Sequence, residues 1–179
     1  MTSLLFFRDK ILELDRRREI YMIVKKYAGC HFRDIERKSK LPASSLKYHL
    51  DYLSKHGIIS EEKEGNTICY FTKEFNTGDK RLLMLLRQES IRKILIYLIT
   101  NKMTKHDDIV QFTKLSPSTV SWHLKKLIAK GIITKNSHAK KTIYTPLFEE
   151  KEIIQLLITY KESFLDVLVN KTIKMWEIN

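Results

Sequence analysis

The chain is poor in the residues that build disulfide frameworks and tight turns. Its 179 residues include two cysteines, three prolines and five glycines. Two cysteines cannot form the disulfide framework of a small secreted domain, and no apolar leader segment is present, so we expect a protein of the reducing cytoplasm. So few turn-forming residues exclude a β-sandwich or barrel with a turn about every ten residues, and they favour a mainly helical fold.

Long apolar runs are also missing, whereas positive charge is abundant. The longest run, residues 94–99, is much shorter than the roughly 18 residues that a membrane-spanning helix needs, so we expect no membrane span. Lys and Arg number 33 against 21 Asp and Glu, a net charge of +12, and hydrophobic residues make up 43%. This balance is typical of a folded protein and excludes a disordered basic tail. The positive surplus predicts a polyanionic partner.

An internal repeat is the most informative feature of the sequence. Residues 41–60 align without a gap with residues 115–134, at an offset of 74 residues. The same offset pairs Arg18 with Arg92, Ile20 with Ile94, Asp34 with Asp108, and Tyr70 with Tyr144. One register held over so many positions indicates two copies of one small domain, over residues 18–72 and 92–146.

Each copy is predicted to contain three helices and a hairpin. In the first copy, apolar residues at helical spacing end at Gly29, a short charged helix covers 31–38, and a third helix over 44–56 ends at Gly57. The second copy has a clear helix start at Ser116-Pro117. Two short strands follow each third helix, joined by polar tips at 64–66 and 136–141. We therefore predict a mainly α fold with small β-wings (α+β), made of two tandem winged-helix domains plus terminal helices.

The third helices carry a resemblance to a known family. Ser-Ser-Leu-Lys-Tyr-His-Leu at 44–50 with Gly57-Ile-Ile, and Ser-Thr-Val-Ser-Trp-His-Leu at 118–124 with Gly131-Ile-Ile, resemble the recognition helix and wing of ArsR-like and MarR-like winged helix-turn-helix regulators. The resemblance covers about two thirds of the chain. It implies that the third helix enters the DNA major groove while the wing contacts the adjacent backbone or minor groove. The Lys-rich and Ile-rich tandem arrangement is similar to archaeal regulators of this kind.

The same resemblance implies a set of DNA-facing side chains in the early turns of these helices. They are Ser44, Ser45, Lys47 and Tyr48 in the first copy, and Ser118, Thr119, Ser121 and Trp122 in the second. His49 and His123 are expected beside them on a half-buried face. Tyr48 and Trp122 stand where such regulators often carry Arg, which favours stacking, methyl contact or backbone packing over direct guanine recognition.

The two copies differ in charge. Residues 115–148 contain six lysines and no carboxylate, a net charge of +6, whereas residues 41–74 contain four lysines and five carboxylates, a net charge of −1. Because phosphate neutralisation supplies most nonspecific affinity, the second copy should hold DNA more tightly, with Lys125, Lys126, Lys140 and Lys141 bordering its recognition helix and wing. The first copy either contacts bases weakly or binds another partner. A further alternative is that the first copy contacts DNA through its basic second helix.

Apolar helices are predicted outside the repeats. A helical stripe near the N-terminus and a second one in a helix that continues to about residue 175 suggest a homodimer seam. The proposed seam residues are Leu4, Phe7, Ile11 and Leu14 with Leu157, Phe164 and Leu168. The alternative is that both helices fold back on their own chain. The predicted segments are a dimerisation helix at 1–16, winged helices at 17–76 and 91–146, a linker helix at 77–90, and a second dimerisation helix at 147–179.

Catalytic and metal-binding patterns are not found in the sequence. No paired Cys or His spacing surrounds Cys30, His31 or Cys69, and no phosphate-binding Gly loop or Ser-His-Asp set occurs, so neither an enzyme, a cofactor nor a metal site is expected. We predict a sequence-specific regulator of transcription that binds double-stranded DNA as a homodimer. The alternatives are a winged-helix adaptor that docks on the transcription or replication machinery, and an architectural DNA-binding protein.

Overall fold

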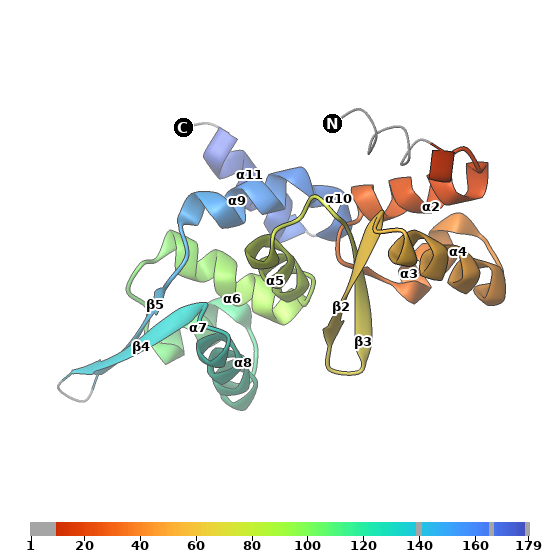
Figure 1. Cartoon of the computed structure of the whole chain (residues 1–179). Helices are drawn as coiled ribbons and strands as arrows, with labels where there is room; N and C mark the ends of the chain where they lie inside the picture. Colours follow the sequence, from red (N-terminus) through yellow and green to blue (C-terminus); the bar gives the residue numbers. More distant parts are fainter. Residues whose placement is uncertain (1–9, 139–140, 165–166, 178–179) are drawn as a thin grey trace. The chain divides into compact units, whose positions relative to one another are not determined.

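The computed structural model of the chain describes residues 10–138, 141–164 and 167–177. The chain divides into two units, residues 1–84 and 85–179, and each unit contains one copy of the repeat (Figure 1). The predicted class is confirmed, because helices predominate and each unit has a small antiparallel sheet. Among the residues described, no helix is long and apolar enough to cross a membrane.

The first unit is a winged helix built on a three-stranded sheet. Its elements in chain order are α2 (Asp15–Lys26), β1 (Cys30–His31), α3 (Phe32–Ser39), α4 (Ala43–Lys55), β2 (Ile59–Glu64), β3 (Thr67–Thr72) and the first part of α5 (Thr77–Leu86). The strands are antiparallel in the order β1-β3-β2. The sequence did not predict β1, in which Cys30 lies opposite Tyr70 and His31 lies opposite Cys69.

The core of this unit uses the apolar positions that helical spacing predicted. The three helices bury Ile20, Val24, Ile35, Leu46, Leu50 and Leu53 almost completely. Helix α4 ends just before Gly57, whose φ of +66° lies in the left-handed region that glycine adopts without strain. The packed helices therefore hold the outer face of α4 and the β2–β3 hairpin in a fixed relation within the unit.

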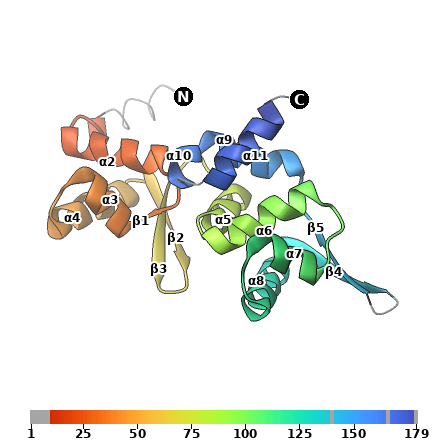
Figure 2. The same ribbon diagram turned by 180° about the vertical axis from the view of Figure 1, so that it is seen from behind.

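The second unit repeats this arrangement and adds helices after the wing. Its elements are α6 (Glu89–Thr100), α7 (His106–Thr113), α8 (Pro117–Ala129), β4 (Ile133–His138), β5 (Lys141–Pro146), α9 (Glu150–Thr159), α10 (Lys161–Phe164) and α11 (Val167–Glu177). As predicted, Ser116 caps α8, because its side chain accepts a hydrogen bond from the backbone N–H of Thr119 at 3.2 Å. The β4–β5 hairpin projects beyond α6, α7 and α8 (Figure 2).

The offset of 74 residues holds for backbone hydrogen bonds as well as for side chains. Asp34 and Asp108 each accept a backbone N–H at the start of their helix, at 3.2 and 3.1 Å. The bridge between Thr104 and Tyr144 in the second unit corresponds to the pairing of β1 with β3 in the first. The two copies thus share one backbone plan.

Two predicted details of the second unit are wrong. The polar wing tip was expected over 136–141, but β4 continues to His138 and β5 begins at Lys141, because Asn136 and Ser137 pair with Ile143 and Thr142. The single C-terminal helix is instead interrupted between α9 and α10. The break lies at Tyr160, which leaves helical geometry with φ −113° and ψ 25°.

The proposed dimer seam is wrong at three of its residues. Ile11, Leu157 and Phe164 are buried within the single chain, so they are not free to pair with a second copy. Phe164 packs in its own unit, where the guanidinium of Arg92 lies 5.3 Å from its ring centroid. Leu14 is exposed. Leu4 and Phe7, and the side chain of Leu168, lie outside what the structure describes.

Candidate nucleic-acid interface

Helix α8 presents a buried apolar side and an exposed side that carries an aromatic ring. Val120, Leu124 and Leu127 face the core, whereas Trp122 is 60% exposed and Lys125 is also exposed. Aromatic rings contribute strongly to binding when an interface buries them. The exposed side of α8 is therefore suited to contact a partner surface.

The hydroxyl groups of α8 are held by other protein groups. The Ser116 hydroxyl lies 3.0 Å from that of Ser118 and 2.8 Å from that of Thr119. The Ser121 hydroxyl lies 2.9 Å from Nε2 of His106, the first residue of α7. These contacts fix the start of α8 against α7. They place the predicted first-turn residues together at one end of the helix.

Helix α4 of the first unit also carries its predicted DNA-facing residues at exposed or half-buried positions. Ser44 and Lys47 are exposed, Ser45 is half-buried and Tyr48 is 60% exposed, the same fraction as Trp122 in the second unit. The helix therefore offers an aromatic ring at the equivalent position, with a lysine and two serines nearby.

His49 and His123 are more deeply buried than the sequence suggested. Their exposed fractions are 8% and 7%, and among the described residues neither Nδ1 atom has a hydrogen-bond partner. Burial lowers the pKa of both rings, and nearby Arg17 lowers the pKa of His49 further, as Lys126 does for His123. Their rings make edge contacts with the neighbouring Tyr48 and Trp122, with centroids 5.3 and 4.9 Å apart. Each histidine thus supports the exposed ring beside it.

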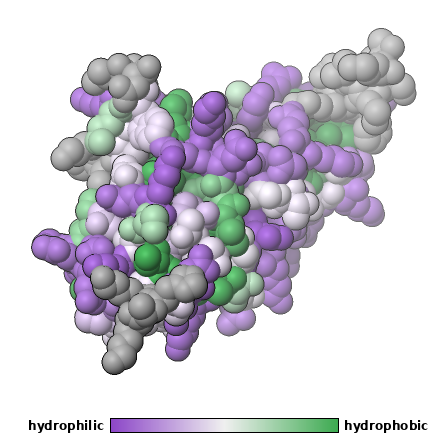
Figure 3. Space-filling model, turned by 90° about the vertical axis from the view of Figure 1, so that its left-hand side faces the viewer, coloured by the Kyte–Doolittle hydropathy of each residue, from purple (hydrophilic) through white to green (hydrophobic). Residues whose placement is uncertain are grey.

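Three described lysines of the second unit, Lys125, Lys126 and Lys135, lie on α8 and β4. Lys125 on α8 and Lys135 on β4 are exposed, and the amino group of Lys126 donates to the side-chain oxygen of Gln88 at 3.1 Å. Lys140 and the side chain of Lys141 lie outside the described part of the chain. Hydrophilic side chains predominate on the face presented in Figure 3, with smaller hydrophobic areas between them.

The turns before α4 and α8 contain a feature that the sequence analysis missed. Lys40 and Lys114 adopt left-handed backbone conformations, with φ values of 55° and 59°, and both are exposed. They occupy the same position in the two copies, so the repeat could have indicated a shared role. Both residues precede the first residue of a third helix by three positions and add positive charge to that turn.

The candidate metal ligands considered in the sequence are cysteines and histidines of the first unit. Within the described residues, no group of three or more His, Cys, Asp or Glu side chains could hold a metal ion. Cys30 and Cys69 are buried. Because Cys30 lies opposite Tyr70 rather than Cys69, the two cysteines point to opposite faces of the sheet.

Comparison with known proteins agrees with this geometry. Residues 14–83 match the model of an N-terminal HTH domain, and residues 87–134 match that of a winged helix-turn-helix DNA-binding domain. The chain is similar to an uncharacterized HTH-type transcriptional regulator of Methanocaldococcus jannaschii, with 33% identity over 137 residues. That region is 76% of this chain but 34% of the relative, so the chain spans about a third of the relative's length. The chain thus carries two tandem helix-turn-helix domains and is homologous to an HTH-type transcriptional regulator.

Proposed function

We propose that this chain is a non-enzymatic transcription regulator that binds double-stranded DNA in a sequence-specific way. One observation carries the proposal: an exposed Trp122 on a helix of the helix-turn-helix type, within a segment of +6 net charge that has no carboxylate. An exposed helix of this kind fits the major groove, and lysines beside it neutralise phosphates.

The second unit is the main DNA-binding module in this proposal. Helix α8 enters the major groove with Ser118, Thr119, Ser121 and Trp122 toward the bases, while Lys125, Lys126, Lys140 and Lys141 contact the backbone. In the first unit, Ser44, Ser45, Lys47 and Tyr48 take the equivalent places, with weaker phosphate contact because its segment carries a net charge of −1. The buried His49 and His123 act by supporting the rings next to them.

We further propose that the chain binds DNA as a homodimer, with winged helices over 17–76 and 91–146 joined by α5 (Thr77–Leu86), which is shorter than the linker helix predicted over 77–90. A two-fold dimer requires an inverted repeat in its site, with half-sites about one helical turn or a multiple apart. The pairing surface does not use Ile11, Leu157 or Phe164, which are buried in the single chain. Light scattering at micromolar concentration should give twice the monomer mass of 21.3 kDa, and a monomer would refute the dimer.

Selection of binding sites from a random duplex library tests the proposal as a whole. A regulator enriches one motif and binds it roughly 10³-fold or more tightly than random duplex at the same salt concentration. An architectural protein binds all duplexes alike, and an adaptor for the transcription or replication machinery barely binds DNA. Either of these results would refute the proposed function.

A further inference from the structure

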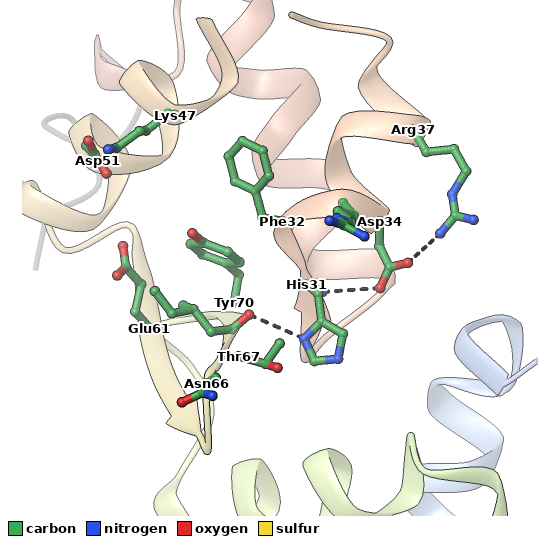
Figure 4. A pocket seen from close by; sticks show the side chains of 12 residues that line it. His31, Phe32, Asp34, Arg37, Lys47, Asp51, Glu61, Asn66, Thr67 and Tyr70 are labelled. Carbon is green, nitrogen blue, oxygen red and sulfur yellow. Dashed lines mark hydrogen bonds and ion pairs between the residues drawn. The ribbon is translucent and has the colours of Figure 1, made fainter. Parts of the chain in front are cut away.

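The first unit contains a cavity that the proposed function does not use. It has a volume of about 830 Å³ and lies between α3, α4 and the β2–β3 hairpin. Small-molecule sites commonly have volumes of about 300–1,000 Å³. In Figure 4, Asp51 and Glu61 come from α4 and β2 on one side, Phe32 comes from α3 on the other, and Tyr70 stands between them. The cavity therefore combines aromatic walls with a carboxylate side.

Tyr70 places an unused polar group in this cavity. The residue is 6% exposed, and its hydroxyl has no hydrogen-bond partner among the described residues. In Figure 4 the hydroxyl points toward the side of Asp51 and Glu61. Because the hydroxyl opens on the cavity, it can form a hydrogen bond with a ligand bound there.

The electrostatic field at this hydroxyl is negative. The pKa of Tyr70 is raised to about 12, first by burial and then by the carboxylates of Glu61 and Asp51. Neither carboxylate forms an ion pair with a described residue, whereas Asp34 on the other side is paired with Arg37 at 2.6 Å. Arg33, Arg37 and Lys47 also line the cavity, and Arg37 is paired with Asp34. At the Tyr70 hydroxyl itself, the charged side chains that raise the pKa are Glu61 and Asp51. A positively charged group would be stabilised there.

The equivalent positions of the second unit carry the opposite charge. At the offset of 74 residues, Asp51 corresponds to Lys125 and Glu61 to Lys135, while Tyr70 corresponds to another tyrosine. Because the two copies share one backbone plan, equivalent surface positions carry carboxylates in the first unit and lysines in the second. Lysines there suit phosphates, and carboxylates suit a cation.

We propose that the cavity of the first unit binds a small organic cation, an ammonium or guanidinium group on an apolar body. The cationic group lies between Asp51 and Glu61 and donates a hydrogen bond to the Tyr70 hydroxyl oxygen. The apolar body packs against the rings of Phe32 and Tyr70, which also attract a cation over their faces. This inference goes beyond the proposed function and does not depend on DNA binding.

Isothermal titration calorimetry of the full chain tests this inference. The probe is 2-phenylethylammonium, and 3-phenylpropionate serves as an anion with a similar body. We expect the cation to bind and the anion to bind at least about tenfold more weakly, because the carboxylates of Asp51 and Glu61 beside the Tyr70 hydroxyl attract the cation and repel the anion. Asp51→Lys and Glu61→Lys should each weaken cation binding by at least about tenfold. Tyr70→Phe should weaken it by about 2- to 12-fold through the loss of one hydrogen bond.

A matched control separates the cavity from general charge. Glu13→Lys makes the same charge change at an exposed residue outside the cavity and should leave cation binding unchanged. Because Glu13, Asp51 and Glu61 are exposed, circular dichroism should show that the three lysine variants are folded. No binding of the cation, equal binding of the anion, or equal weakening by Glu13→Lys would overturn the inference. If the peptide Gly-Lys-Gly bound more tightly than 2-phenylethylammonium, the proposal of a small-molecule ligand would be wrong, and a basic protein segment would be the better candidate. None of these results depends on the DNA-binding assay.

Discussion

Two neighbouring residues of α8 should separate DNA recognition from folding. Trp122 is 60% exposed, whereas Leu124, two residues along the same helix, is 1% exposed. Trp122→Ala removes an exposed ring whose contacts include His123 and, at 5.8 Å, the amino group of Lys126, so the free energy of unfolding should change by no more than about 0.5 kcal/mol. Leu124→Ala leaves a cavity in a filled core and should lower it by about 2 to 5 kcal/mol.

The two effects differ enough to be measured independently. For a unit of this size, each kcal/mol corresponds to a shift of about 4–8 °C in Tm, so Leu124→Ala should lower Tm by at least about 8 °C. Trp122→Ala should lower the ratio of specific to random DNA affinity by about 1 to 3 kcal/mol, which is roughly 5- to 150-fold.

Thermal unfolding and fluorescence anisotropy with specific and random duplexes measure these quantities. The first unit supplies matched controls, because Tyr48 is as exposed as Trp122 and Leu50 is as buried as Leu124. Tyr48→Ala should reduce DNA specificity less than Trp122→Ala, since the first unit carries less positive charge. If Trp122→Ala unfolds the second unit, or leaves specificity intact, the assignment of α8 as the recognition helix is refuted.

Three other perturbations test the electrostatics and the helix cap. Replacing Lys125 and Lys135 by Ala should flatten the dependence of log affinity on log salt by about 0.9 for each lysine that contacts a phosphate, and an unchanged slope would exclude both contacts. Ser116→Ala should lower the free energy of unfolding by about 0.5 to 2 kcal/mol through loss of the α8 cap, measured by urea denaturation. Burial holds the pKa of His49 and His123 below 6.5 in the folded chain. As the pH drops below 6.5, these histidines therefore take up protons more readily in the unfolded chain than in the folded one, and the free energy of unfolding should fall. Urea denaturation at pH 5 and 7.5 should show this fall, and it should become smaller when both histidines are replaced by Asn.

Much of the fold follows from local sequence pattern. The spacing of Leu46, Leu50 and Leu53 predicts the buried side of α4, and the repeat transfers that prediction to α8. Ser116-Pro117 indicates where α8 begins because capping depends on adjacent residues alone. The exposed positions of Tyr48 and Trp122 follow from the same helical period.

Features that depend on distant residues were not predictable in this way. Strand β1 is two residues long and exists because Cys30 and His31 pair with β3, some 38 residues later in the chain. The helix break at Tyr160 has no glycine or proline to mark it. The cavity of the first unit requires α3, α4 and the hairpin to meet, so no local pattern of Tyr70 or Glu61 indicates it.

The left-handed turns at Lys40 and Lys114 bear on how the two copies arose. A non-glycine residue in this conformation costs roughly 1 kcal/mol or more, yet the same residue type occupies it in both copies. Over the third helix and the wing together, the net charge is −1 in the first copy (residues 41–74) and +6 in the second (residues 115–148). An energetically costly backbone detail retained beside a reversed surface charge is the pattern expected of a duplicated gene segment, in which one ancestral scaffold was kept while its exposed chemistry diverged toward two different ligands.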